Sequence, residues 1–470
     1  MTRTNLTALI IASALFMENV DSTVIATALP AIAADIGSDP IRLKLALTAY
    51  LLSLAVFIPL SGWLADRFGA KLVFRLAIVV FMVGSIACSI STSLTEFVLA
   101  RILQGAGGAM MTPVGRLVLL RAVPKSEFLS AMAWFTIPAL MGPLLGPPLG
   151  GFIATYFDWR WIFWINIPIG LVGLVLVTIF VDDVKSPKVQ PLDLTGFVLS
   201  GIGLSGLVFG LSVLGQNMMP LAATLAMIGA GVIASALYLV HAKRVQNPLL
   251  DLSLLKLPTF NCSAVGGSLF RIGIGSIPFL LPLVLQLGLG MTPFQAGLLT
   301  FFSAGGALLM KFTAQPIVRR FGFRTVLIWN GLISSTFLGA MALFAIDPPA
   351  IVIVSVLLVG GFFRSLQFTC LNSMAYAEVD QPRMSFATSL FSVAQQVSLA
   401  IGVAVAAAVI EIQRATRDDP TILASDFIAA FGVVAALSVL AVAFYWRLPA
   451  DAGAEMANGP QPARKPVAST

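Results

Sequence analysis

The stretch Phe16–Pro30, FMENVDSTVIATALP, places two carboxylates, Glu18 and Asp21, deep inside the first long apolar segment of the chain. Residues three apart on a helix lie on the same face, so these two side chains are neighbours. A carboxylate at the centre of a bilayer costs about 2.5–3.5 kcal/mol and therefore faces a protein interior or a watery cavity. The stretch predicts a membrane helix whose polar face lines a pathway. The alternative is that the two carboxylates only hold helices together.

The composition indicates an integral membrane protein. The 470 residues are 58% hydrophobic and 10% charged, with a mean hydropathy of +0.96, which leaves too little polar surface for a soluble globule of this size. Cys88, Cys262 and Cys370 lie in apolar segments without metal-ligand spacing, and His241 is the one histidine. The basic residues are spread over short loops, so we expect no nucleic-acid partner. The chain has no Walker loop and no His-Glu-x-x-His motif, so we expect no enzyme, no metal and no cofactor.

Apolar segments of about 20 residues, the length that crosses a bilayer, occur fourteen times along the chain. They lie near residues 6–28, 43–62, 72–92, 96–120, 127–154, 161–181, 194–214, 220–240, 259–287, 294–317, 324–346, 350–374, 386–410 and 427–446. We therefore expect an all-α membrane protein with fourteen transmembrane helices. With the N-terminus in the cytoplasm, eighteen Lys and Arg residues fall in cytoplasmic loops and five on the other side, as the positive-inside rule requires. Both termini are then cytoplasmic, and we expect a monomer in the lipid bilayer.

The chain contains an internal repeat. The segment GWLADRFGAKL at 62–72 aligns with QPIVRRFGFRT at 315–325, and each follows a predicted span. Duplicated halves are one architecture of transporters, with the substrate near the bilayer midplane between them. The predicted organisation is a six-helix bundle at 1–184, a linker with two inserted helices at 185–249, a second six-helix bundle at 250–449, and a disordered cytoplasmic tail at 450–470.

Five basic residues fall within predicted spans: Arg101, Arg116, Arg271, Lys311 and Arg364. Arg116 and Lys311 lie near the cytoplasmic ends, where long side chains can reach the membrane surface, so a packing role is equally consistent with them. Arg271 and Arg364 lie near the middle of their spans, which favours a functional role. The spans of the second half carry no carboxylate in their core.

Several motifs resemble those of a known family. They are GWLADRFGAK at 62–71, LARILQGAGGA at 99–109, GPLLGPPLGG at 142–151 and DSTVIATALP at 21–30. Together they resemble the major facilitator superfamily, and within it the fourteen-helix drug:proton antiporter branch of the EmrB and QacA types. The segment FRIGIGSIPF at 270–279 and the surroundings of Arg364 are similar to the MdtD subgroup. This resemblance covers nearly the whole chain and implies two six-helix bundles plus two inserted helices.

The resemblance also implies roles for individual residues. A gating motif at the cytoplasmic side would comprise Gly62, Asp66, Arg67, Gly69 and Lys71. The motif that marks exporters and antiporters would comprise Gly142, Pro143, Gly146, Pro147 and Gly150. A glycine at every fourth position also opens a smooth groove for close helix packing.

The resemblance places spans one, four, nine and twelve around a central cavity. Six of the seven intramembrane charges lie on these spans, with only Lys311 elsewhere. We expect Asp21 to carry the proton, with Glu18 as its helper and Arg101 as the charge that tunes both. The expected substrate-binding residues are Arg271, Arg364, Arg116 and Gln104. Four basic and two acidic residues on the cavity spans favour an organic anion, which guanidinium groups bind bidentately.

The sequence therefore predicts a proton-coupled antiporter of the bacterial inner membrane, of the multidrug-efflux type, that exports small organic anions. One alternative is a broad exporter of lipophilic or cationic drugs, with Glu18 and Asp21 as counter-charges. Adaptable methionines would suit that alternative: Met110, Met111, Met141 and Met310. A remote alternative is a receptor or scaffold that transports nothing, although such a protein would not need two homologous halves.

Overall fold

The computed structural model describes residues 3–122, 128–181, 191–213, 219–246, 248–380, 383–417 and 421–453. All regular elements in these ranges are helices. The first group is α1 (Arg3–Asp35), α2 (Lys44–Phe68), α3 (Ala70–Ile90), α4 (Leu94–Ala122), α5 (Phe128–Tyr156), α6 (Trp161–Trp164) and α7 (Asn166–Phe180). The inserted pair is α8 (Leu194–Val213) and α9 (Leu221–Ala242). The last group is η1 (Leu252–Lys256), α10 (Pro258–Asn261), η2 (Cys262–Gly266), α11 (Gly267–Gly275), α12 (Ile277–Leu283), η3 (Val284–Gly288), α13 (Pro293–Phe321), α14 (Phe323–Ala340), η4 (Met341–Ile346), α15 (Ala350–Met374), α16 (Met384–Arg417), α17 (Ala424–Leu440) and α18 (Val442–Trp446).

Twelve helical segments in the described ranges are long and apolar enough to cross a membrane. They include continuous pieces such as Pro258–Gly288, in which α10, η2, α11, α12 and η3 follow one another. The helices α4 and α5 are each 29 residues long and are not among the twelve. Several side chains of α4 and α5 lie outside the described residues.

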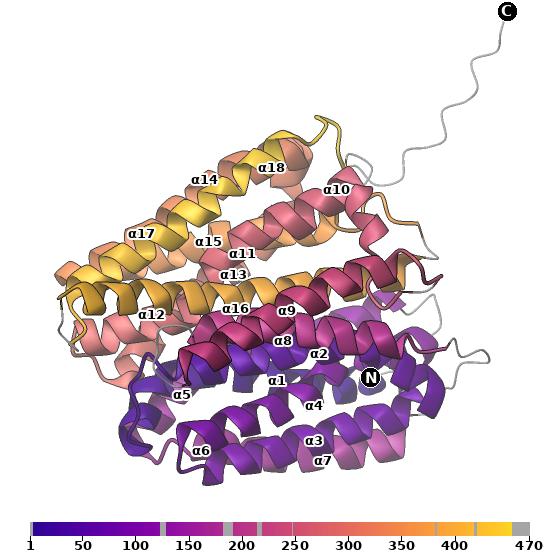
Figure 1. Ribbon diagram of the computed structural model, residues 1–470, viewed down its shortest axis with the longest axis horizontal. Coiled ribbons are helices and arrows are strands. Elements are labelled where there is room, and N and C mark those ends of the chain that lie inside the picture. The colour runs from indigo at the N-terminus through magenta and orange to yellow at the C-terminus, as the bar shows by residue number, and fades with distance from the viewer. Residues whose placement is uncertain are drawn as a thin grey trace, which may run out of the picture.

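The chain forms two helical bundles that face each other (Figure 1). The first bundle, α1–α7, and the second, α10–α18, meet along two seams, where α2 packs against α16 and α5 packs against α13. The inserted helices α8 and α9 pack on each other, and α8 also contacts both α2 and α16. The inserted pair therefore covers the outside of one seam between the bundles.

The repeat appears in the structure as the same turn in each bundle. Gly69 separates α2 from α3 with φ 97°, and Gly322 separates α13 from α14 with φ 74°. Each glycine N–H donates to a carbonyl four residues earlier, at 3.0 Å for Gly69 and 2.9 Å for Gly322. A positive φ is strained for residues with a Cβ, so the glycine of the repeated Arg-Phe-Gly is the residue that allows the turn.

Three glycines of α5 allow α1 to pack closely against it. A Cβ added to Gly142, Gly146 or Gly150 would overlap Asn19, Thr23 or the carbonyl of Val24. The predicted groove therefore exists, and α1 is the helix that fills it. Close packing against α5 sets the rotation of α1 and hence the direction in which Asp21 points.

The linker into the second bundle is held by hydrogen bonds at the end of the molecule where α1 begins and α18 ends. Asp251 Oδ2 accepts a hydrogen bond from Arg383 Nη2 at 2.8 Å, and Asp251 Oδ1 accepts one from Ser253 Oγ at 2.6 Å. Burial opposes ionisation of this carboxyl, but the hydrogen bonds from Ser253 and Arg383 outweigh it and lower the pKa of Asp251. The pair links the start of the second bundle to the turn before α16.

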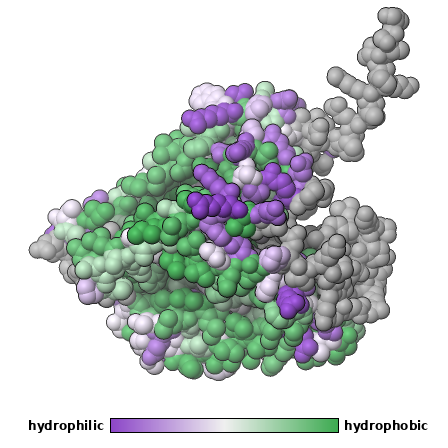
Figure 2. All heavy atoms as spheres, turned by 45° about the vertical axis from the view of Figure 1, so that its right-hand side comes forward, coloured by the Kyte–Doolittle hydropathy of each residue, from purple (hydrophilic) through white to green (hydrophobic). Residues whose placement is uncertain are grey.

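The outer surface is predominantly apolar. Figure 2 shows hydrophobic side chains over most of the visible face, while hydrophilic ones gather toward the end at the right of Figure 1. The helix α1 begins and α18 ends at that same end (Figure 1). Large exposed apolar residues such as Leu99, Ile179 and Trp329 face outward, as expected for a surface in contact with lipid.

Candidate functional site

Asp21 is the centre of a buried hydrogen-bond network inside the first bundle. Its side chain comes from α1, is 1% exposed, and accepts a hydrogen bond at Oδ2 from Arg101 Nη1 of α4 at 2.6 Å. Its Oδ1 accepts from Gln104 Nε2 and from Asn166 Nδ2 of α7, both at 2.8 Å. Ser85 Oγ of α3 accepts from the same two amides, at 2.7 and 3.1 Å. Three helices, α3, α4 and α7, therefore present donors or bridging groups to this one carboxylate of α1.

Arg101 joins this network to a cavity between the bundles. Its guanidinium carbon lies 4.1 Å from the centre of the Tyr50 ring on α2, and both residues line the cavity. Its Nε and Nη2 have no hydrogen-bond partner among the described residues. The predicted proton-site residues Asp21 and Arg101 are thus in direct contact. Gln104, which we expected to bind substrate, is fully buried in the same network and does not line the cavity.

Glu18 has a separate environment. Its Oε2 accepts a hydrogen bond from Thr112 Oγ1 of α4 at 3.1 Å, and its side chain is partly exposed. Glu18 does not line the cavity and makes no hydrogen bond to the Asp21 network in the described part of the chain. Its role as a helper in proton transfer stays a prediction.

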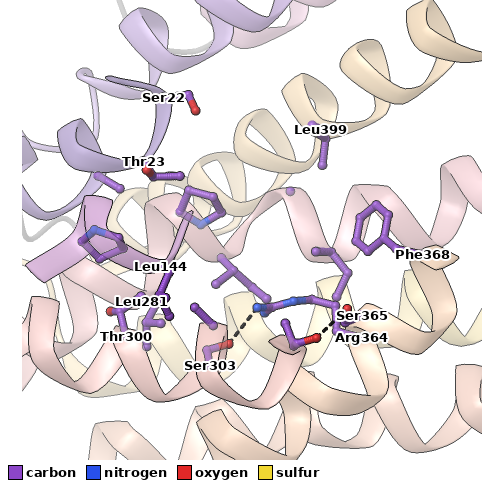
Figure 3. Close-up of a pocket in the computed structure, with 18 of the residues that line it drawn as sticks. Ser22, Thr23, Leu144, Leu281, Thr300, Ser303, Arg364, Ser365, Phe368 and Leu399 are labelled. Atoms are coloured by element: carbon purple, nitrogen blue, oxygen red, sulfur yellow. Dashed lines mark hydrogen bonds between the residues drawn. The ribbon is translucent and has the colours of Figure 1, made fainter. Parts of the chain in front are cut away.

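The cavity has a volume of about 570 Å³ and lies where the two bundles face each other (Figure 3). On one side α1, α2, α4 and α5 line it, and on the other side α11, α12, α13, α15 and α16 line it. Most lining residues are apolar or carry a hydroxyl. The charged lining residues are Arg101, Lys311 and Arg364, and no carboxylate lies on the lining formed by the described residues. Since Asp21 balances Arg101, the surplus charge of the cavity comes from Lys311 and Arg364.

Both surplus cations are anchored by hydroxyl groups instead of carboxylates. Arg364 Nη2 of α15 donates to Ser303 Oγ of α13 at 2.7 Å, and Figure 3 shows this side chain extended toward α13. Lys311 Nζ of α13 donates to Thr369 Oγ1 of α15 at 3.2 Å. Our expectation that Lys311 lies away from the cavity is wrong, because α13 is itself a cavity helix.

Arg271 lies behind the cavity wall. It is fully buried on α11, its Nη1 donates to the carbonyl of Ser263 at 3.1 Å, and its guanidinium lies 4.6 Å from the ring centre of Phe391 and 5.7 Å from that of Phe368. Arg271 does not itself line the cavity, but it contacts two residues that do, Phe368 and Asn372, whose Oδ1 accepts from Arg271 Nη2 at 3.5 Å. The side chain of Arg116 lies outside the described residues, as does that of Pro143. Substrate binding by Arg271 and Arg116 stays a prediction.

The predicted gating motif lies at the turn between α2 and α3. Arg67 is exposed there, Asp66 and Lys71 are partly exposed, and Gly69 supplies the turn itself. Gly62 has nothing within 4 Å of an added Cβ, so close packing does not require a glycine at this position in the described conformation. The gating role of this segment stays a prediction.

Polar contacts between the bundles lie at the end of the molecule opposite to the turn between α2 and α3. Lys44 at the start of α2 is 1% exposed and pairs with Glu411 of α16 at 3.2 Å. Asp39, in the loop before α2, pairs with Arg414 of α16 at 2.9 Å. Gln286 of η3 adds a hydrogen bond to the carbonyl of Thr27 at 2.8 Å. These contacts join the two bundles at the end away from the termini.

The sequence matches the Major Facilitator Superfamily over residues 11–257 and 263–469. The chain belongs to this superfamily, and it is therefore a membrane transporter and not an enzyme. Its relatives include a protein of Pectobacterium atrosepticum named "Putative multidrug resistance protein MdtD", 39% identical over 84% of this chain and 85% of the relative. A protein of the same name from Yersinia enterocolitica is 36% identical over 94% of this chain and 95% of the relative.

Solved structures share the fold at low sequence identity. A POT family transporter in complex with 5-aminolevulinic acid has a TM-score of 0.69 and 15% identity, over 94% of this chain and 96% of that one. A bacterial homologue of the human lysosomal transporter Spinster, in an inward-facing and unoccupied conformation, has a TM-score of 0.66 and 14% identity, over 95% and 97% of the two chains. These likenesses concern the fold alone.

Sequence reasoning missed three residues of the site, Ser85, Asn166 and Tyr50, and it named Lys311 as an intramembrane charge but placed it away from the cavity. Asn166 is a lone amide in an apolar run, WINIPIG, and such a residue within a span usually needs a partner helix. That signal could have identified Asn166. Ser85 and Tyr50 give no comparable signal, because serine and tyrosine are tolerated in spans without a functional partner.

Proposed function

We propose that this chain is a proton-coupled antiporter that exports small organic anions across the bacterial inner membrane. The observation that carries the proposal is the charge of the cavity, whose lining has three cations and no carboxylate in the described residues. A guanidinium or ammonium group in a low-dielectric cavity favours an anionic ligand and disfavours a cationic one. The relatives named for multidrug resistance support export, and the protein would need no cofactor beyond the proton gradient.

The buried Asp21 network is the proposed proton site. Asp21 accepts hydrogen bonds from three donors in the described conformation, in which Lys44 and Glu411 join the two bundles. A proton on Asp21 would remove its pairing with Arg101 and loosen the contact between α1 and α4. Because α1 packs closely against α5 and α5 packs against α13, movement of α1 would shift the interface between the bundles.

The membrane arrangement belongs to the same proposal. The helices α4 and α5 pack within the first bundle and would add two spans to the twelve segments, which gives the fourteen spans of the proposed branch. The positive-inside rule then puts both termini in the cytoplasm, so the ion pairs of Lys44 and Asp39 close the external end. The cavity would load from the cytoplasm, as an exporter requires.

One observation favours a second mode of coupling. Arg101 lines the cavity, so protonation of Asp21 would leave its positive charge facing a bound anion. Proton and anion would then bind more tightly together than separately, which is the thermodynamic requirement of cotransport. The direction of the proton gradient that drives transport distinguishes this cotransport from antiport.

The lining is mostly apolar, which would also suit a second substrate class, lipophilic or cationic drugs. Of the four methionines considered for that role, Met141 lines the cavity, whereas Met111 and Met310 are buried in hydrophobic clusters. A lipophilic cation would meet Lys311 and Arg364 without a lining carboxylate to offset them.

The substrate class is tested by uptake into proteoliposomes with an acidic interior, comparing radiolabelled citrate with ethidium. The variant is Arg364→Ala, and the matched control is Thr300→Ala, which removes an uncharged cavity-lining side chain. We expect citrate uptake that falls at least about tenfold in Arg364→Ala, because a charge-assisted contact is lost, and that persists in Thr300→Ala. Ethidium uptake that tolerates Arg364→Ala, without citrate uptake by the wild type, would overturn the anion preference.

A further inference from the structure

The helices α13 and α15 form one closely packed wall of the cavity. A Cβ on Gly306 would overlap the carbonyl of Leu358, and a Cβ on Gly361 would overlap the carbonyl of Ser303. Ser365 Oγ donates to the carbonyl of Ala307 at 3.3 Å, as Figure 3 shows. The Gly361–Ser303 and Ser365–Ala307 contacts each join residues 58 positions apart, one helical turn from each other, so the two helices run parallel in register.

The register of α13 against α15 sets the positions of Lys311 and Arg364 along the helix axes. The Arg364 guanidinium reaches Ser303, whereas the Lys311 ammonium contacts Thr369. Ser303 and Lys311 are eight residues apart on α13, and eight residues of α-helix rise about 12 Å. The two positive groups therefore occupy different levels of the same wall, separated by roughly this distance.

Neither cation pairs with a carboxylate in the part of the chain that the structure describes. Each donates to a hydroxyl oxygen, and the cavity lining offers no carboxylate among the residues described. Lys311 is exposed, which leaves donors on its ammonium available to a ligand. Ser303 Oγ accepts from Arg364, so its own hydroxyl proton can be donated to a bound anion.

We propose that Lys311 with Thr369 forms a second anion subsite, and that it acts with Arg364 and Ser303 to bind the two ends of one dianionic substrate. This inference rests on the proposed export of organic anions and narrows the substrate to molecules with two separated acidic groups. A cation nitrogen lies about 3.5–4 Å from the carbon of a carboxylate that it hydrogen-bonds. A 12 Å separation of the cations therefore leaves about 4–5 Å between the two carboxyl carbons.

That spacing selects a chain length. An extended carbon chain advances about 1.3 Å per bond, so three or four bonds between carboxyl carbons fit the gap. Four- and five-carbon dicarboxylates have this length. A three-carbon dicarboxylate is too short to reach both subsites, and a monocarboxylate can use only one.

The test is thermal protection of the detergent-purified protein by dicarboxylates of increasing length at constant ionic strength. The ligands are malonate, succinate, glutarate, adipate and the monocarboxylate butyrate. The proteins are the wild type, Lys311→Gln, Lys311→Arg and Arg364→Gln. Ionic strength is held constant because salt screens charge interactions and would mask the effect of length.

We expect the wild-type affinity to peak at succinate or glutarate. Lys311→Gln should lower that affinity about tenfold, to the level of butyrate, and abolish the dependence on length, because one charge-assisted contact is lost. Lys311→Arg, which keeps the positive charge, should retain the peak. Arg364→Gln should weaken the binding of dicarboxylates and of butyrate alike. This difference distinguishes the subsite of Arg364 and Ser303 from that of Lys311 and Thr369.

Two outcomes overturn the inference in different ways. If carboxylates protect the wild type equally at every length, or if Lys311→Gln leaves the peak unchanged, the second subsite does not exist and the anion preference stands. If no carboxylate protects the wild type while ethidium does, the anion preference itself fails and the second subsite fails with it.

Discussion

Removal of one partner of the Asp21–Arg101 pair should destabilise the protein more than removal of both. The pair is fully buried, with both side chains 0% exposed and the ion pair at 2.6 Å. Removal of one partner from a buried ion pair costs about 3–5 kcal/mol, because the remaining charge stays buried without compensation. In Asp21→Asn the uncompensated charge is that of Arg101. In Arg101→Met it is that of Asp21, which keeps the hydrogen bonds of Gln104 and Asn166.

The assay is a double-mutant cycle on thermal unfolding in detergent, with Asp21→Asn, Arg101→Met and the double variant. A loss of 3–5 kcal/mol corresponds to a fall in Tm of roughly 6–20 °C for a unit of 150–250 residues, the size range of each bundle. The double variant should recover most of this loss. Ser22→Ala is the matched control, because Ser22 is the next residue on α1 and faces the cavity.

A coupling energy below about 0.5 kcal/mol, the level expected of independent sites, would contradict this prediction. Single variants as stable as the wild type would refute it equally. Either result would mean that water or another group compensates the buried charge.

Three further predictions follow from the packing and the ion pairs. Gly146→Ala should cost about 1–3 kcal/mol because its methyl group would overlap α1, whereas Gly229→Ala, with nothing within 4 Å, should be neutral; thermal unfolding measures both. Glu411→Gln breaks an ion pair between the bundles at the closed end, so spin labels on α2 and α16 at that end should show a longer distance by pulsed EPR. Asp251→Asn should cost under about 1 kcal/mol at pH 7, since Arg383 is partly exposed. The pKa of Asp251 is lowered in the folded protein, so its ion pair stabilises the fold above the ordinary aspartate pKa of about 3.9, and this stabilisation is lost as the pH falls further. The melting curves of the wild type and the variant should therefore converge below about pH 4.

The sequence was most informative where a rule of membrane physics leaves few choices. Twelve of the fourteen predicted spans are helices of spanning length and hydropathy among the described residues, and the repeated Arg-Phe-Gly motif marks the same positive-φ turn at Gly69 and Gly322. The contact between Asp21 and Arg101 follows from the cost of an unpaired charge in a membrane. These features need no knowledge of how each helix is rotated.

The remaining features of the site depend on rotation and register, which the sequence does not state. Arg271 and Arg364 both lie near the middle of a span, yet Arg364 lines the cavity and Arg271 does not. Lys311 could extend to the membrane surface by its position alone, and only the register of α13 against α15 places it beside Thr369. Asn166 reaches Asp21 because α7 packs on α1, a contact between helices distant in sequence.

The most direct test of the proposed proton site is citrate uptake driven by a proton gradient in proteoliposomes with an acidic interior, comparing the wild type with Asp21→Asn. We predict that the wild type accumulates citrate only with this gradient. We also predict that Asp21→Asn loses the accumulation while it still exchanges citrate in counterflow without a gradient, which shows that the variant is folded. Gradient-driven accumulation that persists in Asp21→Asn would contradict the proton site, and accumulation only with an alkaline interior would replace antiport with cotransport.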